Sequence, residues 1–258
     1  VEQEPMGTAG SVGMLRESLD TTFFVVSGDA LTDFDLQKAL LFHREKKSKA
    51  TLVLTSVPNP LEFGVVITND DGSIAKFLEK PSWGEVFSDT VNTGIYILEP
   101  DVLDLIPPDQ SFDFSKDLFP EMLKREMPLY GYVAEGYWCD IGNLEQYRKA
   151  HQDLCHGRVH LEVPGAVLRK GVLVGKGTQI HPGAHLEPPL VIGKNCRIRE
   201  GARLLEGTVL GDNCIVEEGA TLHRDVVWED TFVGRKVRSK AAIFGRKVTL
   251  KSHVSVGE

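Results

Sequence analysis

Carboxylates that follow apolar segments are the first residues in this chain that could do chemistry. Asp29 comes after the apolar run 23–26, a serine and a glycine, and in an open α/β sheet ligands bind beyond the carboxyl ends of the strands. A carboxylate there suits Mg²⁺, which proteins usually hold with one or two carboxylates and substrate phosphates. The alternative interpretation is a turn aspartate or helix cap leading into Thr32 and Asp33. A second acidic residue, Asp140, follows residues 137–139.

The segment that ends in Glu79 and Lys80 could bind a phosphorylated sugar. We predict that it forms a hairpin with residues 64–68, because the turn 69–72 between them reads Asn-Asp-Asp-Gly. The Glu79 carboxylate could then accept hydrogen bonds from sugar hydroxyls. The Lys80 ammonium could meet a phosphate as a point charge.

Two more segments combine apolar character with polar or flexible positions. Asn92 and Thr93 stand at the start of the otherwise apolar strand 91–98, and the glycine-rich stretch 7–10 leads into a helical pattern. Both are modest signals alone, and together with the preceding segments they indicate a binding site.

The elements that must position these residues belong to an α/β domain. Short apolar runs such as 23–26 and 51–57 alternate with amphipathic stretches such as 34–47 and 117–126, which favours this class. Residues 143–154 then predict a connecting helix that leads into a Pro-Gly turn.

After residue 163 the pattern changes to an apolar residue at every sixth position. The series is Leu168, Val174, Ile180, Leu186, Ile192, Ile198, Leu204, Leu210, Val216, Leu222 and Trp228. This hexapeptide repeat is typical of a parallel β-helix, in which three hexads form one coil and Leu168, Leu186, Leu204 and Leu222 stack as a ladder. The spacing slips after Trp228, so we expect residues 234–243 to bulge out or form a loop.

Composition excludes several classes of protein. The 258 residues carry a net charge of -8, 41% are hydrophobic and only four are cysteines. These values disfavour nucleic-acid binding as the main task, wholesale disorder and a disulfide framework. The chain has no apolar run that could cross a bilayer and no secretory signal at its start. We therefore predict a cytoplasmic protein with no nucleic-acid and no membrane partner.

The motifs, in their order, resemble those of the sugar-phosphate nucleotidyltransferases. They are Gly-Thr-Ala-Gly at 7–10, Gly-Asp at 28–29, Glu-Lys-Pro at 79–81, Asn-Thr-Gly at 92–94 and Trp-Cys-Asp-Ile-Gly at 138–142. Residues 80–87 and 142–147 most resemble the mannose-1-phosphate guanylyltransferase branch. The resemblance covers essentially the whole chain. It implies an α/β fold, with a truncated Rossmann-like nucleotidyltransferase domain at 1–155 and a left-handed parallel β-helix of hexapeptide repeats at 156–258.

The resemblance also implies roles for single residues. It implies that Asp29 and Asp140 are catalytic and share a Mg²⁺ ion, and that Lys80 is catalytic and holds the phosphate of the sugar. The implied nucleotide-binding residues are Gly7, Thr8, Ala9 and Gly28. The implied sugar-binding residues are Gly64, Glu79, Asn92 and Thr93.

The implied reaction joins a sugar 1-phosphate to a nucleoside triphosphate and releases pyrophosphate. Mannose 1-phosphate and GTP, which give GDP-mannose, are the best match. In-line phosphoryl chemistry depends mainly on positioning and on cancelling charge, so no covalent enzyme intermediate is needed.

The family carries a glycine-rich GGxGTRL-type loop near its N-terminus, and this sequence, which begins at Val1, does not contain it. We therefore expect the start of the catalytic domain to be absent and the activity to be impaired. The sheet would be left with an apolar edge that invites pairing with another chain. We expect a homo-oligomer, formed through that edge or through the β-helix.

Three other functions stay open. One is a glucose-1-phosphate nucleotidyltransferase, and the second is a noncatalytic regulatory subunit that binds sugar nucleotide without turnover. The third is a hexapeptide acyltransferase with His181, His185 or His223 as its base.

Overall fold

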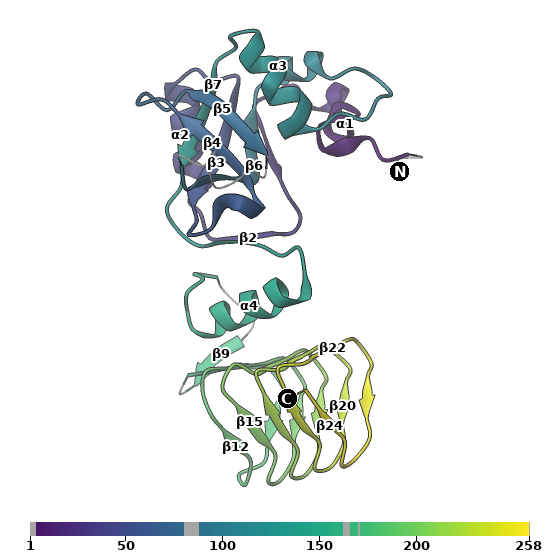
Figure 1. Cartoon of the computed structure of the whole chain (residues 1–258). Coiled ribbons are helices and arrows are strands. Elements are labelled where there is room, and N and C mark those ends of the chain that lie inside the picture. The colour runs from purple at the N-terminus through teal and green to yellow at the C-terminus, as the bar shows by residue number, and fades with distance from the viewer. Residues whose placement is uncertain (1–3, 80–87, 162–165, 170, 258) are drawn as a thin grey trace. The chain divides into compact units, whose positions relative to one another are not determined.

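The computed structural model describes residues 4–79, 88–161, 166–169 and 171–257. The chain divides into two compact units, Val1–Asp140 and Ile141–Glu258 (Figure 1). The sequence-based boundary at residue 155 differs from this division by the helix α4 (Leu144–Cys155), which belongs to the second unit.

The first unit is built on a six-stranded mixed sheet with the order β5-β4-β6-β3-β7, in which β1 also pairs with β6. Strands β3 and β7 are parallel, whereas β6 is antiparallel to β1, β3 and β4. The strands of this sheet are β1 (Phe23–Val26), β3 (Ala50–Ser56), β4 (Gly64–Thr68), β5 (Ile74–Glu79), β6 (Thr90–Leu98) and β7 (Leu129–Val133). A separate two-stranded ribbon consists of β2 (Ala30–Thr32) and β8 (Trp138–Asp140).

Short helices cover the sheet of the first unit. The α-helices are α1 (Gly7–Gly13), α2 (Leu36–Glu45) and α3 (Phe119–Lys124). The 3₁₀ turns are Arg16–Ser18, Pro60–Glu62 and Pro100–Leu105, and a π-helical turn spans Phe114–Leu118. Helix α2 begins after Asp35, whose side chain accepts hydrogen bonds from the backbone of Gln37 and Lys38, as an N-cap aspartate should.

Side chains of the central strand β3 pack on both faces of the sheet. Leu52 and Leu54 belong to the cluster that contains Phe119, whereas Val53 belongs to the cluster of α2 that contains Ala39. This alternation follows from the two-residue period of a strand. Because both faces are covered, every residue of β3 except Ser56 is buried.

The predicted hairpin is confirmed. Strands β4 and β5 are antiparallel, with Gly64 opposite Glu79. Gly72 closes the turn at a φ of 85°, a left-handed conformation in which a residue with a side chain is strained.

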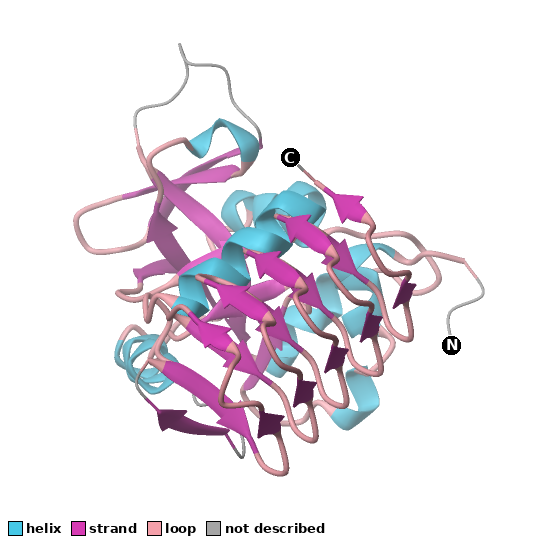
Figure 2. Ribbon diagram, turned by 90° about the horizontal axis from the view of Figure 1, so that it is seen from below, coloured by secondary structure: helices cyan, strands magenta, loops and turns pink. Residues whose placement is uncertain are grey.

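The second unit consists of helix α4, strand β9 (Ala166–Arg169) and a stack of short strands. The stack forms three parallel sheets that repeat along the chain, as Figure 2 shows. One sheet contains β10 (Val172–Gly175), β13 (Leu190–Ile192), β16 (Val209–Leu210), β19 (Val226–Val227) and β22 (Ile243–Phe244). The next contains β11 (Gln179–Ile180), β14 (Arg197–Ile198), β17 (Ile215–Val216), β20 (Phe232–Val233) and β23 (Thr249–Leu250). The third contains β12 (His185–Leu186), β15 (Arg203–Leu205), β18 (Thr221–His223), β21 (Arg238–Lys240) and β24 (Ser255–Val256).

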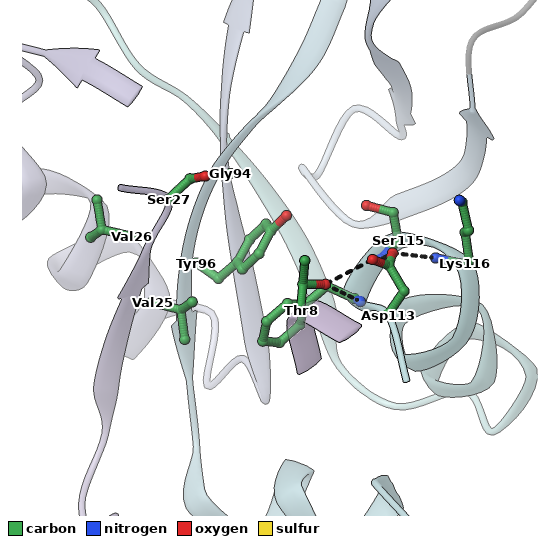
Figure 3. Close-up of a pocket in the computed structure, with 10 residues that line it drawn as sticks. Thr8, Val25, Val26, Ser27, Gly94, Tyr96, Asp113, Ser115 and Lys116 are labelled. Carbon is green, nitrogen blue, oxygen red and sulfur yellow. Dashed lines mark hydrogen bonds between the residues drawn. The ribbon is translucent and has the colours of Figure 1, made fainter. Parts of the chain in front are cut away.

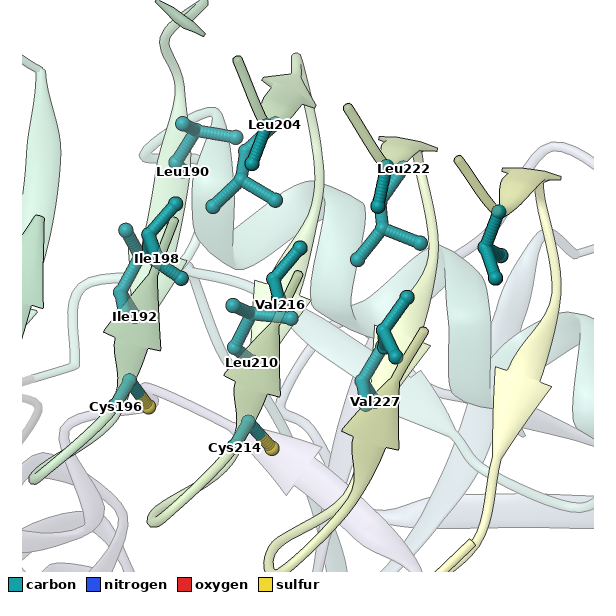
Figure 4. Close-up of a cluster of buried hydrophobic side chains, with 14 of the residues drawn as sticks. Leu190, Ile192, Cys196, Ile198, Leu204, Leu210, Cys214, Val216, Leu222 and Val227 are labelled. Atoms are coloured by element: carbon teal, nitrogen blue, oxygen red, sulfur yellow. The ribbon is translucent and has the colours of Figure 1, made fainter. Parts of the chain in front are cut away.

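Stacked apolar side chains fill the interior of this β-solenoid, as the hexapeptide pattern predicts. Leu204 stacks on Leu222, and Cys196 lies in line with Cys214 (Figure 4). All four side chains are fully buried, and both cysteines are free thiols. Each coil therefore buries its apolar residues only by stacking on its neighbours.

Both ends of the predicted series need correction. Leu168 does not start the leucine ladder, because β9 runs antiparallel to β10 and places Leu168 opposite Leu173. At the other end, Val227 rather than Trp228 is buried in the interior, and Trp228 is 39% exposed. Residues 234–243 form no loop, since they contain β21 and the start of β22.

A shortened corner explains the slip. Arg203 pairs with Thr221, but Thr221 pairs with Arg238, so the repeat changes from 18 residues to 17. The residue is lost between β18 and β19, where two residues replace the three that join β15 to β16. From there on the inward positions come earlier than the six-residue series predicts. They come one residue earlier from Val227 and two residues earlier from Phe244, because the corner between β21 and β22 is also two residues long.

The buried carboxylate of Asp225 completes that shortened corner. One oxygen accepts hydrogen bonds from the Ser239 hydroxyl at 2.9 Å and the Ala242 backbone N–H at 2.8 Å. The other accepts from the backbone N–H of His223 at 3.0 Å. Asp225 is fully buried, and burial raises the pKa of its carboxyl. Asp225 therefore accepts hydrogen bonds from three donors of the shortened corner, which would have no partner without this carboxylate.

Helix α4 covers the apolar outer face of one sheet of the solenoid (Figure 2). Leu173, Val191, Val209, Val226 and Ile243 form the outward column of that sheet. Gln152 donates to the Gly207 carbonyl at 2.6 Å, and the Trp228 indole donates to the Tyr147 hydroxyl at 2.9 Å. The helix thus packs where water would otherwise contact an apolar strip.

Candidate functional site

The ribbon of β2 and β8 brings the two predicted metal ligands together. Ala30 lies opposite Asp140 in this antiparallel pair, and Asp29 is the residue just before Ala30. Both aspartates line one cleft, although the sequence separates them by more than a hundred residues. Their shared cleft is the arrangement that a single cation between them requires.

The electrostatics of the pair favour a cation. The Ser27 hydroxyl donates to Asp29 at 2.6 Å, which fixes the exposed carboxylate. Burial, and then the charge of Asp29, raise the pKa of the Asp140 carboxyl. Two carboxylates that disfavour each other's charge form an oxygen donor set that suits a hard divalent ion.

The described residues contain no cluster of three or more His, Cys, Asp or Glu side chains that could hold a metal. A cation at Asp29 and Asp140 would therefore need further ligands from phosphates or water, and Mg²⁺ is usually bound in that way. The donor set fits Mg²⁺ better than Zn²⁺, which prefers sulfur and nitrogen ligands.

Polar contacts at the far end of the ribbon hold it in place. The backbone N–H of Tyr137 donates to Asp33 at 2.6 Å, and the Thr32 hydroxyl donates to the Tyr137 carbonyl at 2.8 Å. Asp33 thus serves as a turn residue, which is the role that the alternative interpretation gave to this region. It is Asp29, not Asp33, that lies in the cleft.

The cleft has a volume of about 590 Å³, within the range of small-molecule sites. Six residues predicted from the sequence line it, namely Thr8, Asp29, Gly64, Asn92, Thr93 and Asp140. Seven residues that were not among the predicted site residues complete the lining, namely Ser27, Ala30, Glu62, Phe63, Gly94, Ser115 and Trp138. The structure therefore assembles the two predicted metal ligands and three of the predicted sugar-binding residues around one space.

Three of the four predicted nucleotide-binding residues lie outside this lining. Ala9 is fully buried and its backbone N–H donates to the Phe112 carbonyl at 2.9 Å. Gly7 faces the same carbonyl, which would lie 2.6 Å from an added Cβ. Gly28 is exposed beside Asp29. Of the predicted nucleotide-binding residues, only Thr8 reaches the cleft.

The predicted Glu79 and Lys80 lie at the edge of what the structure describes. Glu79 ends β5 opposite Gly64, which lines the cleft. Lys80 lies outside the described residues, so its predicted role stays a prediction.

A bulge in β6 shapes the centre of the cleft. Val53 pairs with Ile95 but Leu54 pairs with Asn92, so Thr93 and Gly94 are extra residues on β6. The Thr93 hydroxyl donates to the Val53 carbonyl at 2.7 Å and its side chain is buried. Thr93 thus stabilises the bulge and has no free hydroxyl proton for a sugar.

Gly94 allows the end of β1 to approach the bulge. Its φ is 76°, and an added Cβ would lie 2.9 Å from the Cβ of Ser27. The backbone N–H of Ser27 donates to the Gly94 carbonyl at 3.0 Å. Because the Ser27 hydroxyl donates to Asp29, this glycine helps to position the carboxylate predicted to bind a metal.

Two aromatic rings form part of the cleft wall. Phe63 and Trp138 meet edge to face with centroids 5.3 Å apart, and the Trp138 indole donates to the Thr93 carbonyl at 3.2 Å. Trp138 belongs to a motif seen in the sequence. No pattern in the sequence indicated that Phe63 and Ser115 belong to the site, because each contacts a residue that lies far away along the chain.

The raised pKa of Asp140 predicts the pH range in which a Mg²⁺ ion bound by the two aspartates would be lost. In the metal-free chain we expect the Asp140 carboxyl to titrate above the ordinary aspartate value of about 3.9, because burial and the charge of Asp29 both disfavour ionisation. Lowering the pH through this raised pKa would protonate a predicted metal ligand, so the affinity for Mg²⁺ should fall. NMR titration of the carboxyl carbons measures this pKa.

The variant Asp29→Asn separates the two causes. It removes the neighbouring charge but not the burial, so the pKa of Asp140 should fall and remain above the ordinary value. An unchanged pKa of Asp140 in this variant would show that the two carboxyls do not interact.

The histidines considered for acyl transfer lie on the solenoid. His181 and His185 are exposed, and the Gly183 backbone N–H donates to His181 at 3.1 Å. His223 is half-buried, 3.8 Å from Glu206. His181 therefore serves a turn, as a solvated solenoid residue would.

Within the described residues, no helix has the length and apolar character needed to cross a membrane.

Comparison with known proteins assigns both parts of the chain to family models. Residues 1–157 match the model described as nucleotidyl transferase, and residues 168–258 match the model described as GMPPB C-terminal domain. The first match covers more than half of the chain.

Several curated proteins are similar to this chain. A UTP–glucose-1-phosphate uridylyltransferase from Synechocystis is 40% identical over 66% of this chain and 45% of its own length. A mannose-1-phosphate guanylyltransferase from Mycobacterium tuberculosis is 33% identical over 69% of this chain and 55% of its own length. A mannose-1-phosphate guanyltransferase from Yarrowia lipolytica is 38% identical over 57% and 40%, respectively. The chain thus spans about half the length of the relatives it matches.

Proposed function

The chain belongs to the nucleotidyl transferase family, and from this membership we propose that it acts on a sugar 1-phosphate and a nucleoside triphosphate. The observation that carries the proposal is the shared cleft of Asp29 and Asp140, since two carboxylates with substrate phosphates are a usual Mg²⁺ site. We propose mannose 1-phosphate and GTP as substrates, and GDP-mannose and pyrophosphate as products.

In the proposed reaction, a phosphate oxygen of the sugar 1-phosphate attacks the α-phosphorus of the triphosphate. The bond from the α-phosphorus to the oxygen that bridges it to the β-phosphorus breaks, and pyrophosphate leaves with that electron pair. Such a displacement needs alignment of the two substrates more than it needs a covalent intermediate.

The residues of the cleft have different roles in the proposed reaction. Asp29, oriented by Ser27, and Asp140 would hold Mg²⁺, which supplies charge neutralisation at the phosphates. Gly64 offers close backbone approach to the sugar, and the β6 bulge beside Asn92 shapes the cleft around it. Phe63 and Trp138 present apolar surface, on which the face of a sugar ring can pack.

A glucose-1-phosphate enzyme is the second candidate, because the Synechocystis uridylyltransferase is 40% identical. The experiment that separates the candidates is a pyrophosphate-release assay of the chain with Mg²⁺. It uses GTP or UTP, each with mannose 1-phosphate or glucose 1-phosphate. We expect the highest turnover with GTP and mannose 1-phosphate, and a preference for UTP and glucose 1-phosphate would favour the second candidate.

Calorimetric titration with GDP-mannose and UDP-glucose completes the test. Micromolar binding without pyrophosphate release would favour a noncatalytic binding subunit over an enzyme. The absence of both binding and turnover would contradict the proposed function. Protection of the solenoid from unfolding by acetyl-CoA would support acyl transfer instead.

A further inference from the structure

The π-helical turn Phe114–Leu118 contributes a polar group to the cleft that the sequence did not reveal. Ser115 lines the cleft, and it also lines an adjoining cavity with Asp113 and Lys116 (Figure 3). Phe114 anchors this turn in the core, where its ring lies 4.9 Å from that of Tyr96 and 5.6 Å from that of Phe119. The turn is therefore a fixed wall of the site.

Asp113 fixes the geometry of the turn with both carboxylate oxygens. One oxygen accepts hydrogen bonds from the backbone N–H groups of Ser115 at 2.9 Å and Lys116 at 3.2 Å. The other accepts from the Thr8 hydroxyl at 2.8 Å (Figure 3). The carboxylate thus caps the turn and joins it to α1.

The Thr8 hydroxyl is committed to this joint. It donates to Asp113 and accepts from the backbone N–H of Phe114 at 3.1 Å. Its single proton is therefore used within the protein, and Thr8 is an anchor rather than a donor to a ligand.

Asn92 is committed in the same way. Its side-chain N–H₂ donates to the Tyr96 hydroxyl at 2.9 Å and to the Ser115 hydroxyl at 3.2 Å. Its side-chain carbonyl accepts from the backbone N–H of Gly94 at 3.1 Å. Both protons of this amide are used, so Asn92 orients Ser115 and leaves no donor of its own for a sugar.

Ser115 is the hydroxyl of this group whose proton has no acceptor among the described contacts. Its oxygen accepts from Asn92, which directs the remaining O–H away from that amide, and the side chain is half-buried in the wall of the cleft. A hydroxyl held in this way is pre-organised to donate to an oxygen of a ligand, because little freedom is lost when the ligand binds.

We propose that the Ser115 hydroxyl donates a hydrogen bond to an oxygen of the bound sugar 1-phosphate, with Asn92 and Asp113 as positioning residues. The inference rests on the proposed function, and it deepens it by naming a sugar-phosphate contact. We assign the Ser115 contact to the sugar 1-phosphate rather than to the nucleotide, since Ser115 shares the cleft with Asp140 and Gly64.

The test compares Ser115→Ala with Ser111→Ala, which removes an exposed hydroxyl from the same segment and outside the cleft. We expect Ser115→Ala to weaken binding of mannose 1-phosphate and GDP-mannose about five- to tenfold, the range of one lost hydrogen bond. Binding of GDP alone and the unfolding temperature should not change. Equal behaviour of the two variants would overturn the proposal, as would an equal loss for GDP.

The positioning role of Asp113 has its own readout. Asp113→Ala should lose as much affinity for mannose 1-phosphate as Ser115→Ala, whereas Asp113→Asn keeps a carbonyl oxygen for the cap and should restore most of it. The double variant of Asp113→Ala and Ser115→Ala should bind no more weakly than either alone. Fully additive losses would overturn the role of Asp113 as a residue that acts through Ser115.

Deoxy analogues of the sugar phosphate identify the accepting oxygen. An analogue that lacks the accepting hydroxyl should bind weakly to the unmodified chain and no more weakly to Ser115→Ala. If Ser115→Ala weakens every analogue equally, the acceptor is a phosphate oxygen. If the unmodified chain binds neither mannose 1-phosphate nor GDP-mannose, the proposed function itself fails, and this inference fails with it.

Discussion

Replacement of Asp140 by alanine is expected to lower the Mg²⁺-dependent affinity of the chain for GDP-mannose at least about a hundredfold, or about 3 kcal/mol. The variant leaves Asp29, whose carboxylate is exposed, as the remaining aspartate of the cleft. In the proposed site, one aspartate would hold a Mg²⁺ ion more weakly than two. Titration calorimetry with and without Mg²⁺ measures the effect, and pyrophosphate release should fall by at least the same factor.

The matched control is Asp20→Ala, which removes an exposed carboxylate outside the cleft and should change neither quantity. Asp29→Ala should reproduce the loss seen with Asp140→Ala, because both residues hold the same ion. If Asp140→Ala kept the full dependence of binding on Mg²⁺, the two-carboxylate site would be wrong.

The second large effect concerns the stability of the solenoid. Asp225→Ala should lower the free energy of unfolding of the second unit by about 3 kcal/mol, because it leaves three buried donors without an acceptor. Those donors are the Ser239 hydroxyl and the backbone N–H groups of His223 and Ala242. Urea denaturation followed by far-ultraviolet circular dichroism measures the loss.

Two variants serve as comparisons. Asp225→Asn keeps one acceptor oxygen and should lose less stability than Asp225→Ala. Thr208→Ala removes the buried residue at the equivalent corner of the preceding coil, where the hydroxyl donates to the Leu205 carbonyl at 2.7 Å, and should cost about 1 kcal/mol. Equal stability of Asp225→Ala and Thr208→Ala would contradict the role given to the carboxylate.

The same aspartate predicts a dependence of stability on pH. Burial raises the pKa of Asp225 in the folded chain, so the folded state binds a proton more tightly than the unfolded state. Its contribution to stability is thus greatest below the unfolded pKa and is lost as the pH rises through the raised folded pKa. The difference in unfolding free energy between the original chain and Asp225→Asn should show this slope.

Much of the fold was predictable because the signals are local. Hydrophobic periods depend only on which side chains of a strand or coil point inward, so they indicate an α/β unit followed by a solenoid. The hairpin of β4 and β5 follows from its turn residues in the same way. The prediction from the hexapeptide series was wrong at Trp228 for two reasons. An apolar residue can lie on the inner or the outer face of the solenoid, and the loss of one residue from a corner produces no recognisable pattern in the sequence.

The site was predictable only in part. Asp29 stands out because it follows an apolar run, and Asp140 because it comes just before the predicted connecting helix. The order of the motifs around them resembles that of a known family. Ser27, Asp113 and Ser115 were missed, although they orient the groups that were found. The hydrogen-bond partners of Ser115 and Asp113 lie on other segments of the chain, because Asn92 donates to Ser115 and Thr8 donates to Asp113. No spacing in the sequence indicates such contacts.

The sequence by itself determined the class of each half and the types of residue available for binding a metal and a sugar. Only the tertiary structure decided which hydroxyls and amides keep a proton for a ligand. Thr8, Asn92 and Thr93 use theirs within the protein, whereas the Ser115 hydroxyl proton has no acceptor among the residues that the structure describes. The physical reason is that hydrogen-bonding capacity is divided among groups that folding brings together from distant positions, so it is a property of the assembled cleft and not of any segment.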